Sequence, residues 1–315
     1  MNRNMPTVSI SVIIPTYQRA HVIGDAIDSV LRQTHRDFEL IVVDDGSTDG
    51  TADAVGRFKD ERLRLVSIEH GGRSRARNEG ARVARGEALV FLDSDDQAEP
   101  DWLRELVLSL EGPAPVVCCG ARYTTMTPHP GLEADRTLMP ARLGVIYANR
   151  VGLFLAGTFA VRREVFETVG GYDPRLAYAE NTELSIRLAE YCEEHSLPFA
   201  VVHKPIVWIR RWRGFGGAGD FRTCLEATEL ILQRHGRPRG QVKLSSWANY
   251  RAIAGVNASR LGLSGRAIYH LAAAAASKPG SAVHWARLGL SLVPPVARRF
   301  WTRHAREHAP GQALP

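Results

Sequence analysis

Residues 88–96 read Ala-Leu-Val-Phe-Leu-Asp-Ser-Asp-Asp, an apolar run that ends in three carboxylates within four residues. The apolar part predicts a buried strand, which would deliver Asp93, Asp95 and Asp96 to its carboxyl end. Neighbouring carboxylates repel one another, so a fold keeps such a cluster mainly where a cation offsets it. Ligands that are all oxygen favour Mg²⁺ or Mn²⁺, which leave coordination places for substrate phosphates. The alternative is an acidic turn that caps a helix beginning near Pro100.

Strands alternate with helices through the part of the chain around this stretch. Apolar, β-branched runs predict strands at 8–14, 38–43, 63–68 and from 88 onward, and apolar residues at helical spacing predict helices at 25–33, 51–58 and 74–85. This alternation favours an α/β fold with a doubly wound, mostly parallel sheet. Polar stretches at 15–17, 44–47 and 93–96 follow strand ends. They should therefore meet at the carboxyl edge of the sheet, where such folds bind ligands.

Composition excludes several classes of protein. The chain has 315 residues, of which 44% are hydrophobic and 23% charged, enough for one large domain and an appendage. Its four cysteines lack metal-ligand spacing, which argues against a disulfide framework and a zinc site. Neither a signal peptide at residues 1–8 nor a membrane-spanning apolar run is expected. From Pro205 to the end, 17 Lys and Arg stand against 4 Asp and Glu, so the carboxyl-terminal third is basic.

The first strand is not followed by a GxGxxG fingerprint or a Walker motif, which disfavours dinucleotide oxidoreductases, ATPases and kinases. A nucleotide can still be held by the ring of Tyr17, the carboxylate of Asp45 and a metal on its phosphates.

Four motifs carry a resemblance to a known family. They are Ser-Val-Ile-Ile-Pro-Thr-Tyr-Gln-Arg at 11–19, Glu-Leu-Ile-Val-Val-Asp-Asp-Gly-Ser-Thr-Asp at 39–49, Ala-Arg-Asn-Glu-Gly at 76–80, and the stretch 86–96. In this order, over roughly the first hundred residues, they resemble the motifs of family 2 glycosyltransferases. The resemblance implies a GT-A fold, with a catalytic domain at 1–215, and the charge and helical spacing of residues 216–315 predict a basic helical region after it. Within that domain the nucleotide-sugar half would be 1–112 and the acceptor half 113–215.

The resemblance also assigns roles to individual residues. The positions that hold the nucleotide correspond to Pro15, Thr16, Tyr17, Arg19, Asp45, Arg77, Asp93 and Asp95. The Asp45 carboxylate would accept a hydrogen bond from N3–H of uracil, and Asp95 and Asp96 would bind the metal. For Arg77 the alternative is a solvated helix residue, which its place in the Ala-Arg-Asn motif disfavours.

The position of the general base departs from the family pattern. Where the family carries Glu-Asp at the start of its acceptor helix, this chain has Glu180 and Asn181. The family's base is a carboxylate here, usually the Asp, and an amide cannot take up a proton. Glu180 is therefore the first candidate for the base and Glu183 the second, with Asp173 next. Asn181 can also be read simply as the N-cap of the helix.

The carboxyl-terminal part predicts helices at 223–235, 245–261, 264–276, 281–292 and 296–306, which would form a small bundle. Its excess of arginine suits either an anionic membrane surface or a solvated face. Before these helices, Arg211 and Trp212 resemble the QxxRW signature of processive family members, but Trp208 stands in place of Gln, so a non-processive enzyme is expected. The glycine-rich stretch 214–219 reads as a hinged lid or a linker. His203 is a candidate third metal ligand, with a structural role as the alternative.

The sequence thus predicts a metal-dependent, inverting glycosyltransferase of the hexosyl- or N-acetylhexosaminyltransferase type. It would move one sugar from a UDP-sugar, or another nucleotide-sugar, to a saccharide or lipid-linked acceptor in surface polysaccharide or glycoconjugate synthesis. The expected location is cytoplasmic, with peripheral contact at the inner face of the membrane. A nucleotidyltransferase on the same sheet, or a nucleotide-sugar binding protein that lacks catalysis, are the alternatives. Nucleic acid is not an expected partner, because no RNA or DNA motif accompanies the basic charge.

Overall fold

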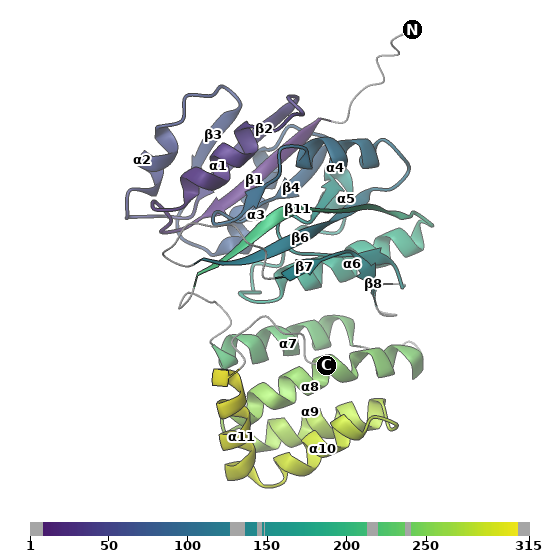
Figure 1. The fold of residues 1–315 in the computed structure, drawn as a ribbon. Helices are drawn as coiled ribbons and strands as arrows, with labels where there is room; N and C mark the ends of the chain where they lie inside the picture. Colours follow the sequence, from purple (N-terminus) through teal and green to yellow (C-terminus); the bar gives the residue numbers. More distant parts are fainter. Residues whose placement is uncertain are drawn as a thin grey trace. The chain divides into compact units, whose positions relative to one another are not determined.

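The computed structural model describes residues 9–126, 136–143, 147, 149–212, 220–236 and 241–307. The chain divides into two compact units, one made mainly of residues 1–214 and the other mainly of 215–315; the short segment 175–179 groups with the second (Figure 1). Two expected features fall wholly or partly outside the described residues. They are the glycine-rich stretch 214–219 and residues 127–135 of the stretch 113–140, whose Pro, Thr and Gly predict a loop over the site with one strand at 116–123.

The first unit is built on one large sheet with the strand order β3-β2-β1-β4-β10-β6-β11-β5, and β7 pairs with β6. The strands are β1 (Ile10–Thr16), β2 (Phe38–Asp44), β3 (Leu63–Ser67), β4 (Ala88–Phe91), β5 (Gln97–Ala98), β6 (Val116–Met126), β7 (Arg136–Leu138), β10 (Phe159–Arg162) and β11 (Phe199–Trp212). A separate pair consists of β8 (Ala141–Arg142) and β9 (Val151–Gly152).

Strands β3, β2, β1 and β4 run parallel, as the alternation of strands and helices predicts. The departure comes after β4, where β10 lies antiparallel to both β4 and β6. Two further differences concern the predicted loop at 113–140. The strand expected at 116–123 continues to Met126, and β7 pairs back against it.

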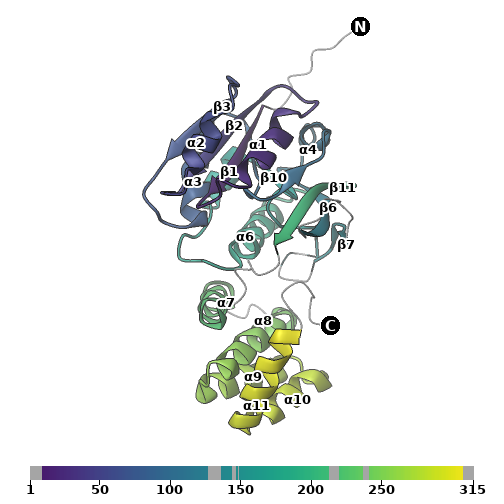
Figure 2. The ribbon, with the colours of Figure 1, turned by 60° about the vertical axis from the view of Figure 1, so that its left-hand side comes forward.

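Helices cover both faces of this sheet (Figure 2). They are α1 (Ile23–Leu31), α2 (Thr51–Gly56), α3 (Arg73–Val83), α4 (Trp102–Leu110), α5 (Arg163–Thr168) and α6 (Glu180–Glu194). Apolar residues of α1, α2 and α4 belong to one buried cluster, and those of α3, α5 and α6 belong to another. Successive side chains of a strand point to opposite faces, so β1 contributes Val12 and Ile14 to the first cluster and Ile13 to the second. All seven residues of β1 are buried, as expected of a strand covered on both sides.

Helix α3 lies very close to β1. A Cβ added at Gly80 would stand 2.5 Å from Cγ2 of Ile13, so only glycine lets the helix approach the sheet this far. Arg77 lies one turn earlier on the same helix, and its side chain is buried as a result.

The second unit contains the five predicted helices, with ends shifted by a few residues. They are α7 (Phe221–His235), α8 (Gln241–Arg260), α9 (Ser264–Ser277), α10 (Ala282–Ser291) and α11 (Pro294–Glu307). Pro294 and Pro295 lie between the last two predicted helices in the sequence, but they form the first turn of α11, where proline loses no intrahelical hydrogen bond. Among the described residues we find no helix with the length and apolarity that a bilayer crossing requires.

Candidate active site

Three predicted site segments meet at the carboxyl ends of β1, β2 and β4. Thr16 is opposite Asp44 in the register of β1 and β2, and the Asp45 amide donates to the Thr16 carbonyl at 2.9 Å. On the other side of β1, Ile13 pairs with Phe91, two residues before Asp93. The expected convergence of polar strand ends is therefore present.

The loop after β1 is held by the loop after β2. The Gln18 amide donates to Oγ of Ser47, and the Gln18 side-chain oxygen accepts from the Thr48 amide. The Arg19 amide donates to the Thr51 hydroxyl, and the Ala20 amide donates to a carboxylate oxygen of Asp49. These contacts explain why the motif at 39–49 ends in small polar residues: they position the backbone that carries Tyr17 and Arg19.

Asp45 lies in a cradle of backbone amides and is 2% exposed. Its two carboxylate oxygens accept hydrogen bonds from Gly71 and Gly72, each at 2.8 Å. Nδ1 of His70 lies 3.0 Å from the same carboxylate, and the His70 ring stacks on Tyr17 with centroids 4.1 Å apart. Each carboxylate oxygen has two lone pairs, so Asp45 retains capacity for one further donor. His70 was not predicted as a site residue. The Gly71-Gly72 pair that follows it after β3 is the sequence feature that could have indicated it.

The acidic turn after β4 presents its three carboxylates in different environments. Asp93 and Asp95 are partly exposed, whereas Asp96 is 3% exposed. Burial raises the pKa of Asp96 well above its usual range, and the charges of Asp93 and Asp95 add to the shift. Burial also raises the pKa of Asp95, with Asp93 again contributing. Arg19 approaches Asp95 only to 4.0 Å.

Arg77 is a deeply buried charge of the site, with 1% of its side chain exposed. Its Nη2 donates to Asp93 at 2.6 Å and its Nη1 donates to Glu180 at 3.0 Å. Its guanidinium also lies 5.1 Å from the ring centre of Tyr172. Burial by itself lowers the pKa of Arg77, but the charges of Asp93, Tyr172 and Glu180 raise it on balance. The alternative of a solvated helix arginine does not describe this residue.

The next residue, Asn78, ties α3 to the segment before α6. Its side-chain amide donates to the Tyr172 carbonyl and accepts from the Tyr172 amide, each at 2.8 Å. The Tyr172 hydroxyl in turn donates to Oδ1 of Asn181 at 2.9 Å. Asn181, which stands where the family carries its usual Asp, is thus oriented by a buried phenol. The roles of Asn78 and Tyr172 were not predicted.

The two candidate bases on α6 differ in their partners. Glu180 is 5% exposed and pairs with Arg77, and Arg73 lies 3.8 Å from the same oxygen. Glu183 is 1% exposed and takes both Nε and Nη2 of Arg187, at 2.9 and 2.5 Å.

Arg210, on β11, is a further residue that sequence reasoning missed. Its amide donates to Oδ1 of Asp96 at 2.9 Å, and its Nε donates to the Asp95 carbonyl at 2.5 Å. Its Nη1 pairs with Asp25 on α1 at 2.6 Å. The side chain is 3% exposed, so the buried guanidinium of Arg210 holds the backbone of the acidic turn in place.

Two other predictions for β11 have different outcomes. His203 is exposed and lies seven residues before Arg210 on the same strand, about 20 Å from the acidic turn at the rise of an extended chain. It does not join the carboxylates. The Trp208 indole donates to Glu99 at 2.7 Å and stacks with Arg122, while the side chains of Arg211 and Trp212 lie outside the described part of the chain.

The donor atoms of the acidic turn fit a hard divalent cation. Asp95 and Asp96 offer carboxylate oxygens, and a bound cation would offset the repulsion and burial that raise their pKa values. Within the described ranges, no three His, Cys, Asp or Glu side chains converge as a metal-binding group. Carboxylate oxygens are ligands that Mg²⁺ and Mn²⁺ accept, and both ions leave coordination places for phosphate and water.

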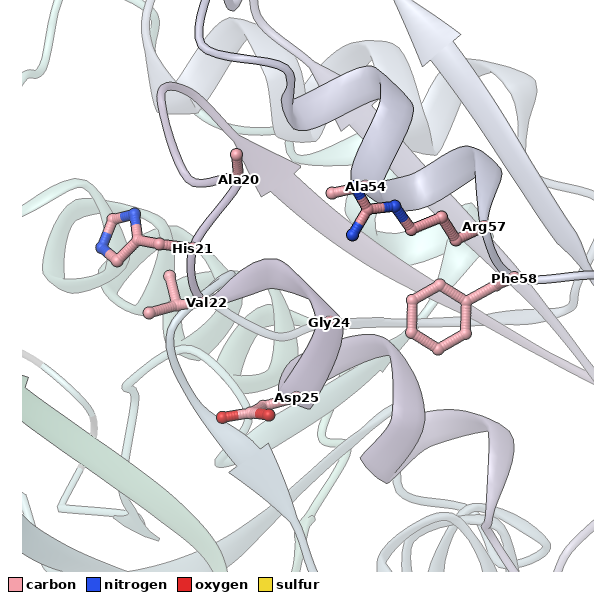
Figure 3. A pocket seen from close by; sticks show the side chains of 8 residues that line it. All are labelled: Ala20, His21, Val22, Gly24, Asp25, Ala54, Arg57 and Phe58. Atoms are coloured by element: carbon pink, nitrogen blue, oxygen red, sulfur yellow. The ribbon is translucent and has the colours of Figure 1, made fainter.

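A cavity of about 340 Å³ lies beside the loop that follows β1, between the start of α1 and α2 (Figure 3). Figure 3 places the Phe58 ring next to Gly24 and the Asp25 carboxylate at the opposite side. None of the residues predicted for the active site lines this cavity.

In sequence, the chain is similar to known glycosyltransferases. Over 133 residues the chain is 40% identical to validoxylamine A glucosyltransferase of Streptomyces hygroscopicus subsp. jinggangensis, covering 40% of this chain and 32% of the relative. Over 88 residues it is 43% identical to WfgD of Escherichia coli, a UDP-Glc:alpha-D-GlcNAc-diphosphoundecaprenol beta-1,3-glucosyltransferase, covering 28% and 35%. The chain thus spans about a third of the length of these relatives.

Solved structures share the fold over nearly the whole chain. S. aureus TarS 1–349 in complex with UDP-GlcNAc superposes with a TM-score of 0.66 at 18% identity, covering 95% of this chain and 92% of TarS 1–349. The mannosyltransferase PcManGT of Pyrobaculum calidifontis, in complex with GDP-Man and Mn²⁺, has a TM-score of 0.58 at 22% identity, covering 95% and 84%. At these identities the likeness confirms the predicted GT-A fold with its helical carboxyl-terminal region.

The family model for "Glycosyl transferase family 2" matches residues 11–170, which is half of the chain and contains all four motifs. The geometry of the strand ends and this match lead to one conclusion: the chain belongs to glycosyltransferase family 2.

Proposed function

We propose that this chain is a metal-dependent, inverting glycosyltransferase of the hexosyl- or N-acetylhexosaminyltransferase type, which transfers a single sugar from a nucleotide-sugar to a saccharide or lipid-linked acceptor. The observation that carries the proposal is the buried Arg77, which pairs with Asp93 of the acidic turn and with Glu180 at the start of α6. One cation thereby couples the expected donor side of the site to the expected acceptor side.

A UDP-sugar is the favoured donor. The Asp45 carboxylate lies 3.0 Å from Nδ1 of His70, whose ring stacks on Tyr17. A carboxylate beside aromatic rings suits a pyrimidine that stacks on a ring and donates N3–H to a carboxylate. Pro15 and Thr16 form the end of β1 beside it. The UDP-GlcNAc complex of a protein with the same fold supports this choice, while the GDP-Man complex of another makes GDP-sugars the second group to test.

We assign the metal to Asp95 and Asp96, and the Mn²⁺ in the complex of PcManGT supports a divalent ion. When bound there, such an ion supplies positive charge to the leaving diphosphate. Asp93 remains paired with Arg77, which leaves its second oxygen for a ribose hydroxyl.

We assign the general base to Glu180. In a direct displacement, a bond forms between the acceptor oxygen and the anomeric carbon while the bond from that carbon to the diphosphate oxygen breaks. The hydroxyl proton passes to the Glu180 carboxylate, and the configuration at the anomeric carbon inverts. Glu183 is fully engaged by Arg187, which suits a structural role that anchors α6.

The acceptor and location form part of the same proposal. WfgD, by its name, acts on a sugar carried by diphosphoundecaprenol, which supports a lipid-linked acceptor, surface polysaccharide or glycoconjugate synthesis, and work at the inner face of the membrane. The excess of 17 Lys and Arg over 4 Asp and Glu from Pro205 onward supports peripheral contact with anionic lipid.

The test is to incubate the full chain with a panel of UDP- and GDP-sugars, Mn²⁺ and saccharide or lipid-linked acceptors, and to detect the released nucleotide. Release of UDP with transfer of the sugar is expected. Release of sugar 1-phosphate, with the nucleoside monophosphate transferred to the acceptor, would instead indicate a nucleotidyltransferase, and tight nucleotide-sugar binding without turnover would indicate a binding protein. Full activity in excess EDTA would refute the assignment of the metal.

A further inference from the structure

Helix α11 exposes an apolar flank. Ala297 is 1% exposed, and the Trp301 carbonyl accepts a hydrogen bond from Arg260 of α8, so this side of the helix is anchored within the second unit. On the flank beside it, Leu292, Val296 and Phe300 are 62%, 53% and 42% exposed. Their spacing of four residues places all three along one stripe that starts at the turn before the helix.

A cationic cavity adjoins this flank. It has a volume of about 760 Å³ and lies between α11 and the turn that leads into α9. Arg298 and Arg299 line it together with the hydroxyl residues Ser264 and Thr302, and no acidic residue lines it. The Arg298 guanidinium packs over Gly262, within 3.6 Å of where a Cβ would stand. In the described part of the chain neither arginine forms a salt bridge, so their charges are available to a ligand.

The two features together discriminate among ligands. Arginine and hydroxyl donors around one cavity suit a phosphate group, because guanidinium binds phosphate oxygens in a forked geometry. A nucleic acid would offer phosphates but no use for the exposed Leu292, Val296 and Phe300. A bilayer of anionic phospholipid offers both, since apolar side chains at the level of the headgroups enter the acyl boundary while arginines meet the phosphates.

We propose that α11 and the turn before it are a docking surface for anionic phospholipid, with a headgroup phosphate bound in the cavity by Arg298 and Arg299. The inference rests on the proposed function in one respect: a lipid-linked acceptor requires the enzyme to work at a membrane. It goes further in naming the surface, the residues and the lipid charge.

The experiment is co-sedimentation of the full chain with vesicles of phosphatidylcholine alone or mixed with phosphatidylglycerol. The wild type is expected to sediment with the anionic vesicles and to stay in solution when only neutral vesicles are present. Each arginine near an anionic surface is worth about a fivefold change in partitioning, so Arg298→Glu with Arg299→Glu should reduce it by at least about tenfold. Raising the salt concentration should also weaken binding, because exposed charges are then screened.

Matched variants in the first unit control for net charge and for apolar exposure. Arg32→Glu with Arg82→Glu changes the net charge equally at two exposed sites, 76% and 68% open to solvent. Leu108→Glu, 57% exposed, is matched to Val296→Glu, 53% exposed. Partitioning should fall for the α11 variants and stay within about twofold for the controls. Far-ultraviolet circular dichroism and the unfolding midpoint check that each variant folds, and Arg298→Gln with Arg299→Gln is the milder substitute.

Equal binding to neutral and anionic vesicles, or equal losses in α11 and control variants, would overturn the proposal. So would saturable binding of inorganic phosphate without binding to either vesicle, since the cavity would then serve a free anion. Transfer to a soluble acceptor is measured without vesicles in parallel. Transfer without vesicle binding would overturn the docking surface alone, and vesicle binding without any transfer would support the surface while refuting the proposed reaction.

Discussion

Replacing Glu180 by Gln tests the assignment of the general base with little change in shape. Gln keeps an oxygen that can accept from Nη1 of Arg77, now 3.0 Å from the carboxylate, and it removes the charge. Arg77 still has Asp93 at 2.6 Å, so the guanidinium does not become an unpaired buried charge.

The expected sizes of the two effects of Glu180→Gln, on stability and on turnover, distinguish a catalytic role from a structural one. A hydrogen bond to a charged group contributes about 1.5–3 kcal/mol and a neutral one about 1 kcal/mol, so the free energy of unfolding should fall by about 1–2 kcal/mol. Loss of a general base lowers turnover by roughly 10²- to 10⁴-fold, or about 2.7–5.5 kcal/mol on the barrier. Donor affinity should change by less than about threefold, because the base acts on the acceptor hydroxyl in the transition state.

The assay measures kcat and KM for the donor and acceptor found active in the nucleotide-sugar panel, together with the donor Kd by calorimetry and the unfolding free energy in urea. Asn181→Asp is the informative companion, because it restores the family's usual carboxylate beside the Tyr172 hydroxyl. A weaker donor Kd with unchanged kcat in Glu180→Gln would refute the assignment and leave Glu180 as a partner that positions Arg77. If Glu183→Gln also leaves kcat unchanged, the base lies elsewhere and Asp173 is next.

Three further outcomes are expected. Asp96→Asn should abolish stabilisation by Mn²⁺ in a thermal melt while the chain still folds, and an unchanged Mn²⁺ response would contradict the assignment. Because the folded-state pKa values of Asp95 and Asp96 are raised, the stability that their protonated forms contribute to the metal-free protein is lost as the pH rises through these values. The Mn²⁺-induced rise in Tm should accordingly shrink as the pH is lowered from about 7.5 to about 5, since protons compete with the metal. Glu183→Gln should lower the unfolding free energy by about 3–5 kcal/mol in urea, because Arg187 then lacks its buried counter-charge, and a loss below about 1 kcal/mol would argue against the structural role.

Much of the fold follows from local pattern. The β-branched runs that become β1 and β2 are buried on both faces, and the helical spacing between them specifies α1. Both signals depend on residues close together in the chain, so they can be read without the tertiary structure. The antiparallel placement of β10 could not be read in this way. Its pairing with β4 joins residues that are separated along the chain by α4 and the long strand β6. An apolar run also does not specify the direction of the strand beside it.

The sequence by itself determined the kind of chemistry and the edge of the sheet where it belongs. A strand that ends in Asp93, Asp95 and Asp96, and a second that ends in Asp45, place carboxylates at one edge in any parallel sheet. The tertiary structure alone decided which of these charges are paired. Arg77 pairs with Glu180 across 103 residues, and the Asp96 carboxylate accepts a hydrogen bond from the backbone amide of Arg210 across 114. Such partners have no mark in the local sequence because they depend on how helices and strands pack. Burial then decides how strong such an electrostatic interaction is, since an ion pair removed from water is far less screened than one at the surface.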